Sequence, residues 1–259
     1  MKPMNINIFD TKKELGEQSG QKAAKKIRKA IRENGTANII LATGASQFET
    51  LNSLVNNSDI DWSKVNMFHL DEYIGIPDTH PASFRKYLKE RFVDNVSALK
   101  EAHFISGDAE NPLEECRRLN RIIRDHPVDV ALVGIGENGH LAFNDPPADF
   151  DTEDPYIIVE LDDACRRQQM GEGWFKRLDD VPAKAISMSI KQIMKSKSII
   201  CSVPDKRKAE AVKNCLEHPV SNLHPASILQ MHSDCMIYLD TESASLLSNK
   251  NRTTEFLQQ

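Results

Sequence analysis

No run of apolar residues in the sequence approaches the roughly 18 that a membrane-spanning helix requires. Residues 1–10 also lack the basic and then apolar layout of a signal peptide, so we expect a cytoplasmic protein without a membrane partner. Cationic residues are not in excess, because 33 Lys and Arg against 38 Asp and Glu give a formal net charge of −5. A general nucleic-acid binder needs a net basic face, so we expect no nucleic-acid partner either.

Cysteine is scarce, with five residues in the whole chain and no C-x-x-C pair. An odd number of widely spaced cysteines predicts reduced core residues, and neither a disulfide framework nor a zinc site. The sequence also lacks internal repeats, low-complexity segments and any linker rich in Pro, Gly or Ser. With 40% hydrophobic and 27% charged residues, the chain is predicted to form one domain over residues 1–259, with a flexible polar tail at 248–259.

What the sequence does contain is an alternation of amphipathic helices with short, continuously apolar strands. A capping box at Thr11 and Glu14 begins the first predicted helix, which ends at Asn34 and Gly35. Further helices are predicted to begin at a second capping box at 46–49, near Pro81 and at 111–112, and strands at 38–42, 65–70, 129–133, 186–189, 199–203 and 236–239. Strands that are apolar on both faces and separated by helices predict a doubly wound α/β fold, a mostly parallel, Rossmann-like sheet with helices on both faces.

In such a sheet, ligands bind outside the carboxyl ends of the strands. One of these ends carries Thr43, Gly44, Ala45 and Ser46, where a tight turn would present hydroxyls and free N–H groups to an anion. The segment matches neither the Walker A loop nor the G-x-G-x-x-G fingerprint. An ordinary turn between a strand and a helix is therefore an alternative interpretation.

A second strand end leads into a glycine-rich loop at 134–146. Gly134, Gly136 and Gly139 would let the backbone approach a ligand closely, and Asp145 follows His140 by five residues. A carboxylate that orients an imidazole and supports its charged form suits proton transfer near neutral pH. The alternative is a core histidine that is satisfied by local hydrogen bonds.

A third strand end leads into an acidic loop with Asp71 and Glu72. Adjacent side chains in extended backbone point to opposite sides, so at most one of the two carboxylates would face a common cleft. A solvated acidic loop is the alternative. A metal site made of His69, Asp71 and His80 has no supporting spacing, and we expect no metal.

Three cations, Lys206, Arg207 and Lys208, follow Asp205 at a predicted helix start. Positive charge in a first turn opposes the helix dipole, and a phosphate bound near Lys208 would offset this conflict. The alternative is that the long side chains extend into water at little cost.

Taken together, these segments resemble the glucosamine-6-phosphate deaminase (isomerase) family. The resemblance covers residues 39–240 and is carried by D-E-Y-x-G at 71–75 and G-x-G-x-N-G-H-x-A-F-N-D-P at 134–146, in this order. It implies a doubly wound enzyme that converts glucosamine 6-phosphate to fructose 6-phosphate and ammonia without an organic cofactor.

The resemblance also implies residue roles. His140 would open the sugar ring by proton transfer to the ring oxygen, with Asp145 and Asn138 beside it. Asp71 would remove the C2 proton and return it to C1, giving an enolamine and then an imine that water hydrolyses. The substrate and its phosphate would be held by Thr43, Gly44, Ala45, Ser46, Gly136 and Lys208.

The chain departs from the family pattern at several positions. Gln47 stands where the phosphate turn T-G-x-T-P has proline, Asn138 where many members have Asp, and Asp145 where they usually have Glu. An Arg expected before two aromatic residues is replaced by Gly173, and Arg166 or Arg167 is an alternative source of that charge.

Two other functions therefore stay open. One is a 6-phosphogluconolactonase or a related hexose-phosphate isomerase. Lactonases share the general fold but resemble G-G-H-T-A-S, whereas this chain has Leu-Ala-Phe-Asn-Asp-Pro at 141–146 after His140. A sugar-phosphate-binding regulator that has lost turnover is the other alternative. Neither the gluco or galacto preference nor the oligomeric state follows from the sequence, and a homo-oligomer is one outcome.

Overall fold

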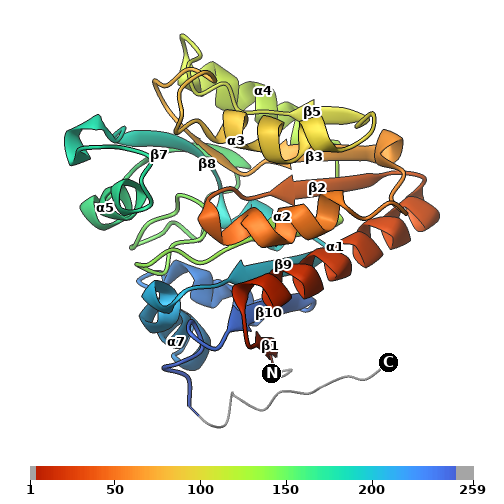
Figure 1. The fold of residues 1–259 in the computed structure, drawn as a ribbon. Helices are drawn as coiled ribbons and strands as arrows, with labels where there is room; N and C mark the ends of the chain where they lie inside the picture. The colour runs from red at the N-terminus through yellow and green to blue at the C-terminus, as the bar shows by residue number, and fades with distance from the viewer. Residues whose placement is uncertain (1–3, 249–259) are drawn as a thin grey trace.

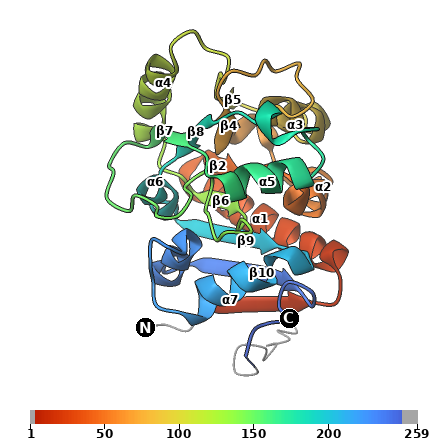
Figure 2. The same ribbon diagram turned by 90° about the vertical axis from the view of Figure 1, so that its left-hand side faces the viewer.

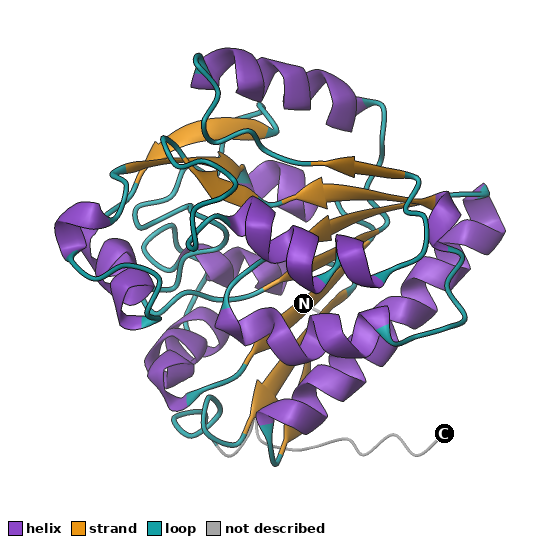
Figure 3. Cartoon of the chain, turned by 45° about the horizontal axis from the view of Figure 1, so that its top comes forward, coloured by secondary structure: helices purple, strands orange, loops and turns teal. Residues whose placement is uncertain are grey.

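The computed structural model describes residues 4–248, in which helices flank a central sheet of seven parallel strands (Figures 1 and 3). The strands are, in spatial order, β1 (Asn5–Phe9), β10 (Cys235–Asp240), β9 (Ser198–Val203), β6 (Val130–Val133), β2 (Ala37–Leu41), β3 (Val65–His69) and β5 (Glu101–His103). Of the tail predicted at 248–259, all but Ser248 lies outside the described residues.

Helices cover both faces of this sheet, as the sequence predicts. Neighbouring residues of β2 point to opposite sides, so Ile39 packs into one hydrophobic cluster and Ile40 into the other. The first cluster is covered by α1 (Lys12–Asn34), α2 (Phe48–Val55) and α3 (Phe84–Arg91). The second is covered by α4 (Pro112–Arg124), α6 (Ile190–Met194) and α7 (Ala209–Glu217).

The direction in which successive strands are added to the sheet changes between β2 and β6. From β2 the chain continues outward through β3 to β5, and it then returns to β6 on the other side of β2 and continues to β9 and β10. The loops that follow β2 and β6 therefore leave the sheet next to each other, which is where doubly wound folds bind ligands. Figure 2 looks toward this edge, with α5 (Asp163–Gly171) in front of it.

A second, antiparallel sheet of three strands was not predicted. It contains β4 (Asp71–Tyr73), β8 (Lys184–Met188) and β7 (Tyr156–Glu160), and the N–H of Met188 donates to the carbonyl of Leu70 at the junction with β3. The prediction of an acidic loop after β3 was wrong, because Asp71 and Glu72 form a buried strand. The strand predicted at 186–189 belongs to this sheet and not to the parallel one.

Side-chain caps fix most helix starts where they were predicted. Thr11 caps α1 and Asn111 caps α4, while the helix expected from Pro81 begins after its cap Ser83. The capping box predicted at Ser46 was wrong. A 3₁₀ turn, η1 (Ala45–Gln47), precedes α2, which begins without a side-chain cap.

The cysteines are free and buried, as predicted for reduced core residues: Cys116, Cys165, Cys201, Cys215 and Cys235. Over residues 4–248, none of the helices has both the length and the apolar character that crossing a bilayer demands.

Candidate active site

A cleft lies at the carboxyl end of the sheet, at the reversal point between β2 and β6. Predicted site residues from four separate segments line it: Thr43, Gly44, Ser46, Asp71, Gly136, His140 and Lys208. The topology thus brings residues far apart in the sequence into one cavity. Ala45 is exposed and does not line this cleft, while Asp145 and Asn138 lie behind His140.

His140 is paired with Asp145. The ring Nδ1 lies 3.1 Å from Asp145 Oδ1, and both side chains are largely buried. Burial by itself would raise the pKa of Asp145, but hydrogen bonds and charge from His140, together with the N–H donors of Asn138 and Asp162, hold that pKa below its usual value. An ionised Asp145 fixes the imidazole orientation and favours a proton on Nδ1, which leaves Nε2 to exchange a proton in the cleft.

Asn138 holds the loop around this pair. Its amide nitrogen donates to Asp145 Oδ1 at 3.0 Å and to Asp162 Oδ2 at 3.3 Å, while its amide oxygen accepts from the backbone N–H of His140 at 3.0 Å. The side chain therefore contacts His140 only at its backbone N–H, and it reaches the imidazole indirectly, through Asp145.

Gly136 is needed for the position of the His140 ring. A Cβ at this residue would lie 2.2 Å from His140 Nε2, closer than any two such atoms can approach. The glycine-rich loop predicts that its backbone comes close to another group. At Gly136 that group is the imidazole of His140.

Asp71 reaches the cleft from β4 on the side opposite to Glu72. The residue is 7% exposed, and burial together with the neighbouring negative charge of Glu72 raises the pKa of Asp71 to about 8. A carboxylate with a raised pKa is a stronger base than an ordinary Asp. The site therefore has a carboxyl suited to accept a proton from carbon near neutral pH.

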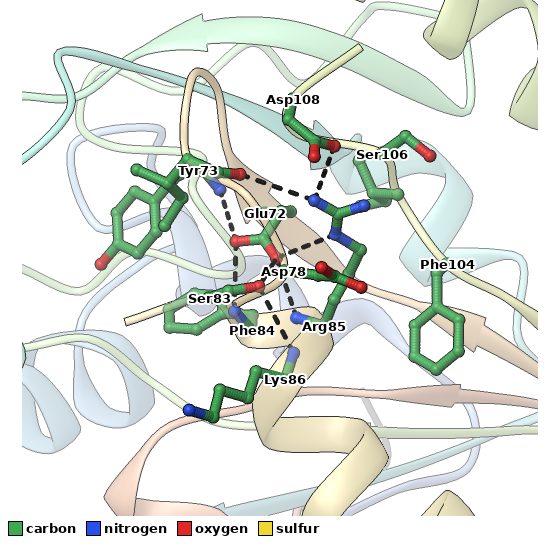
Figure 4. Close-up of polar contacts among 12 residues, drawn as sticks. Glu72, Tyr73, Asp78, Ser83, Phe84, Arg85, Lys86, Phe104, Ser106 and Asp108 are labelled. Atoms are coloured by element: carbon green, nitrogen blue, oxygen red, sulfur yellow. Dashed lines mark hydrogen bonds and ion pairs between the residues drawn. The ribbon is translucent and has the colours of Figure 1, made fainter. Parts of the chain in front are cut away.

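Glu72 is fully buried and binds the first turn of α3 (Figure 4). Its carboxylate accepts hydrogen bonds from the hydroxyl of Ser83 and from the backbone N–H groups of Phe84 and Arg85, at 2.8–3.2 Å, and from its neighbour Tyr73 N–H. Burial raises the pKa of Glu72 to about 7 in spite of these donors. The alternation predicted for the acidic pair is confirmed, since only Asp71 faces the cleft.

The guanidinium of Arg85 extends this network toward solvent. It lies 3.8 Å from Glu72 and donates to Asp108 at 2.7 Å, so it links β4 to the loop after β5 (Figure 4). The strand that carries Asp71 is thereby anchored on two sides.

The turn at 43–46 forms the other end of the cleft. Gly44 has φ +89°, a backbone conformation that other residues rarely adopt, and its carbonyl accepts from the hydroxyl of Tyr87 at 2.9 Å. Gln47, in the place of the proline, donates to Ser46 Oγ and to the carbonyls of Val133 and Ser202. The amide of Gln47 thus braces the turn against β6 and β9.

Lys208 points into this end of the cleft and is only 5% exposed. Burial lowers the pKa of its ammonium group. Of the two interpretations of the three cations, extension into water is wrong for Lys208 and fits the exposed Lys206. Arg207 is exposed as well, but its guanidinium pairs with Asp205 and Glu137. A buried cation above a turn of free N–H groups is suited to bind an anion.

Neither arginine considered as a substitute reaches the cleft. Arg166 donates to the carbonyls of Leu178 and Val181, and Arg167 is exposed beside Asp163. Sequence reasoning missed two aromatic lining residues and three polar ones on or directly after α5: Phe84, Phe143, Gln168, Gln169 and Glu172. Two of them had a signal: Phe143 lies within the motif at 134–146, and Glu172 directly precedes the position where the family pattern has Arg.

Cys165, predicted as a core residue, packs behind the His140 and Asp145 pair. One ligand atom of each of the three residues lies within 4.8 Å of the others, the spacing of a potential metal site. Burial and the negative charge of Asp145 raise the pKa of the Cys165 thiol well above its usual value. Since metals bind the thiolate, this environment favours a neutral thiol that packs against Asp145.

Comparison with known proteins gives one consistent family. The sequence profile described as "Glucosamine-6-phosphate isomerases/6-phosphogluconolactonase" matches residues 10–238. The chain is 38% identical over 250 residues to a glucosamine-6-phosphate deaminase of Lacticaseibacillus paracasei, covering 95% of this chain and all of that one. It is 40% identical over 228 residues to a deaminase of the same description from Streptococcus pneumoniae, covering 88% and 95%.

Solved structures agree with the sequence matches. A monomeric glucosamine-6-phosphate deaminase superposes with a TM-score of 0.84 at 31% identity, covering 94% of this chain and all of that one. The 6-phosphogluconolactonase of Trypanosoma brucei superposes with a TM-score of 0.78, covering 95% and 99%, but at 17% identity, so it shows the shared fold alone.

Proposed function

The chain belongs to the family of glucosamine-6-phosphate isomerases and 6-phosphogluconolactonases, and we propose that it is a glucosamine-6-phosphate deaminase, an enzyme that acts on an amino-sugar phosphate. The observation that carries this proposal is the presence of Asp71 and His140 in one cleft, with Asp145 paired to His140 behind it. Deamination with isomerisation needs both: a carboxylate for the carbon-bound proton and an imidazole for the ring oxygen.

Ring opening is the first step of the proposed mechanism. His140 would transfer a proton from the anomeric hydroxyl to the ring oxygen, which breaks the C1–O5 bond and gives the open-chain aldehyde. Asp145 stabilises the imidazolium that forms and keeps the ring aimed at the cleft. Asn138 holds Asp145 in place through its amide N–H.

Asp71 would then carry out the proton transfer between carbons. Its carboxylate removes the C2 proton to give an enolamine and returns a proton to C1, and water hydrolyses the resulting imine with release of ammonia. One carboxylate that reaches neighbouring carbons satisfies both halves of this step. The buried setting of Asp71, which raises its pKa, makes it a base of suitable strength.

The phosphate would bind at the opposite end of the cleft. Lys208 supplies the charge, and Thr43, Gly44 and Ser46 supply backbone N–H groups and hydroxyls. Binding at this end fixes the hexose for both proton transfers. Gly136 would contribute through the position it allows for His140.

The lactonase alternative is less well supported. The relatives at 38–40% identity are described as deaminases, while the lactonases match by fold at 17% identity. The residues after His140 also resemble those of the deaminases.

Ammonia release from a panel of hexosamine 6-phosphates tests the proposal and reveals any gluco or galacto preference. We expect turnover by the parent protein and a loss of at least about 100-fold in Asp71→Asn and in His140→Gln, the order expected for removing an acid or base. Asp163→Asn, which removes an exposed carboxylate from α5, is the matched control. Calorimetric binding of glucosamine 6-phosphate without product would instead favour the regulator, and hydrolysis of 6-phosphogluconolactone the lactonase.

We also propose a cytoplasmic location, which the five free, buried cysteines support because such thiols persist in a reducing compartment. Formation of a homo-oligomer stays a prediction.

A further inference from the structure

The proposed phosphate end of the cleft already contains a carboxylate. Glu172 follows the last residue of α5 and lines the cleft together with Gly44 and Lys208. One of its carboxylate oxygens, Oε2, lies 3.7 Å from the point that a Cβ on Gly44 would occupy. A negatively charged side chain thus lies directly over the turn that is best suited to bind an anion.

Neutral donors hold Glu172 in this place. Gln168 Nε2 donates to Oε1 at 3.0 Å, and the indole N–H of Trp174 donates to Oε2 at 3.4 Å. Gln168 in turn accepts from the backbone N–H of Glu137 at 2.8 Å, so the carboxylate is tied to the loop after β6. Among the charged groups around Lys208, Glu172 contributes most to raising the pKa of that ammonium. The carboxylate and the ammonium therefore lie close enough to interact.

The cleft is small while Glu172 lies in it. Within the cleft, the centre of a water molecule can occupy about 70 Å³, so little room is left beside the Glu172 carboxylate. We therefore expect part of this lining to move when a hexose phosphate binds. Glu172 is half-exposed and is followed by Gly173 at φ +86°, with nothing within 4 Å of the Cβ position of that glycine, so the segment after α5 has open space on that side.

We propose that Glu172 sets the affinity of the cleft for phosphorylated ligands: its carboxylate occupies the phosphate end of the cleft in the free enzyme, and the substrate's phosphate must displace it. A phosphate dianion bound over Gly44 would lie next to the Glu172 carboxylate, and the two negative charges would repel each other. The two groups therefore cannot both lie over Gly44. Glu172 thereby weakens binding of every phosphorylated ligand by a constant factor. The inference rests on the proposed function, which assigns the anion as the phosphate of a sugar phosphate.

Glu172→Gln tests this inference, because the amide keeps the size of the side chain and removes its charge. We expect the variant to bind inorganic phosphate and fructose 6-phosphate about five- to tenfold more tightly in calorimetry, the order expected for removing one like charge. KM for glucosamine 6-phosphate should fall by a similar factor, with a smaller change in kcat. The gain should shrink as salt concentration rises, which a purely structural effect would not do.

Glu160→Gln is the matched control. Glu160 is an exposed residue of β7 that pairs with Lys184 outside the cleft, and its replacement removes the same charge by the same substitution. We expect phosphate affinity in this variant to equal that of the parent.

Two results would overturn the inference. Unchanged or weaker phosphate binding by Glu172→Gln would mean that the carboxylate does not compete with phosphate. A raised KM for glucosamine 6-phosphate with unchanged affinity for inorganic phosphate would place Glu172 against the substrate's ammonium group. Because inorganic phosphate binding needs no turnover, a parent protein that releases no ammonia would defeat the proposed function while the phosphate comparison still decides the role of Glu172.

Discussion

Asp71 is the residue whose protonation should control the rate. As a base it must be ionised, and burial followed by the charge of Glu72 raises its pKa to about 8. A raised pKa means that the active form is lost as pH falls below that value. We therefore expect kcat/KM to rise with pH on its acidic limb with a midpoint near 8, as measured by initial rates of ammonia release across buffers of constant ionic strength.

Glu72→Gln should move that midpoint to lower pH, because it removes the second cause of the raised pKa. The midpoint is independent of how much of the variant is folded, so partial destabilisation does not obscure the shift. Glu101→Gln, at an exposed position on β5, should leave the profile unchanged. An acidic limb near pH 4 in the parent, or the same midpoint in Glu72→Gln, would contradict the assignment of Asp71 as the base.

Single residues differ in how far the sequence predicts their place. His140 and Asp145 are predicted as a pair because the motif keeps them in one loop, and the structure places them 3.1 Å apart. Glu172 was not predicted, because its position depends on how α5 folds back over the turn at Gly44, and no local pattern encodes that return. Whether these residues act as proposed stays a prediction until the variants are measured.

At the scale of elements, the junction of β4 with α3 determines where Asp71 points. Ser83 makes two contacts there: its Oγ accepts from the N–H of Lys86 as the helix cap, and its hydroxyl donates to Glu72. The strand is only three residues long, so its position depends on Glu72 being held at the helix N-terminus. The Ser83 hydroxyl thus caps α3 and also holds Glu72 of β4, the strand that carries Asp71.

Ser83→Ala should destabilise the protein by about 2 kcal/mol, from the lost cap and from one buried acceptor left with fewer donors. Thr11→Ala removes a comparable cap from α1 that has no buried carboxylate behind it, and should cost about 1 kcal/mol. Urea unfolding followed by circular dichroism measures both. Equal losses in the two variants would show that Glu72 gains nothing from the Ser83 hydroxyl.

The strands of the parallel sheet were predicted where they are apolar on both faces, as in β2, β3, β6, β9 and β10, whose residues are almost all buried. Three strands were not predicted: β1 and β5 at the edges of the parallel sheet, and β7 at an edge of the antiparallel one. Each carries partly exposed or polar residues. β4 was taken for a loop because acidic residues normally signal solvent. The hydrogen bonds that satisfy the buried Glu72 carboxylate come from the start of α3. The sequence does not show that this helix start lies next to Glu72.

For the whole molecule, the doubly wound order of strands places the residues proposed for catalysis and for anion binding in one cleft. The turn after β2, the strand after β3 and the loops after β6 and β9 each contribute one part of it. Since no single segment forms the cleft alone, a ligand that fills it contacts most of the sheet's carboxyl edge. Binding should therefore stabilise the native state as a unit.

Fructose 6-phosphate at 100 times its dissociation constant should stabilise the protein by about 2.7 kcal/mol. This corresponds to a rise in Tm of roughly 5–10 °C for a chain of this size, measured by differential scanning calorimetry. Lys208→Met, which keeps the length of a buried side chain and removes its charge, should lose most of that rise at the same ligand concentration. Asp71→Asn should retain it, because Asp71 is proposed to act on the carbon-bound protons of the sugar and not on its phosphate. An equal shift in Lys208→Met and the parent would mean that the phosphate does not bind beside Lys208, and that the two ends of the cleft have been assigned the wrong way round.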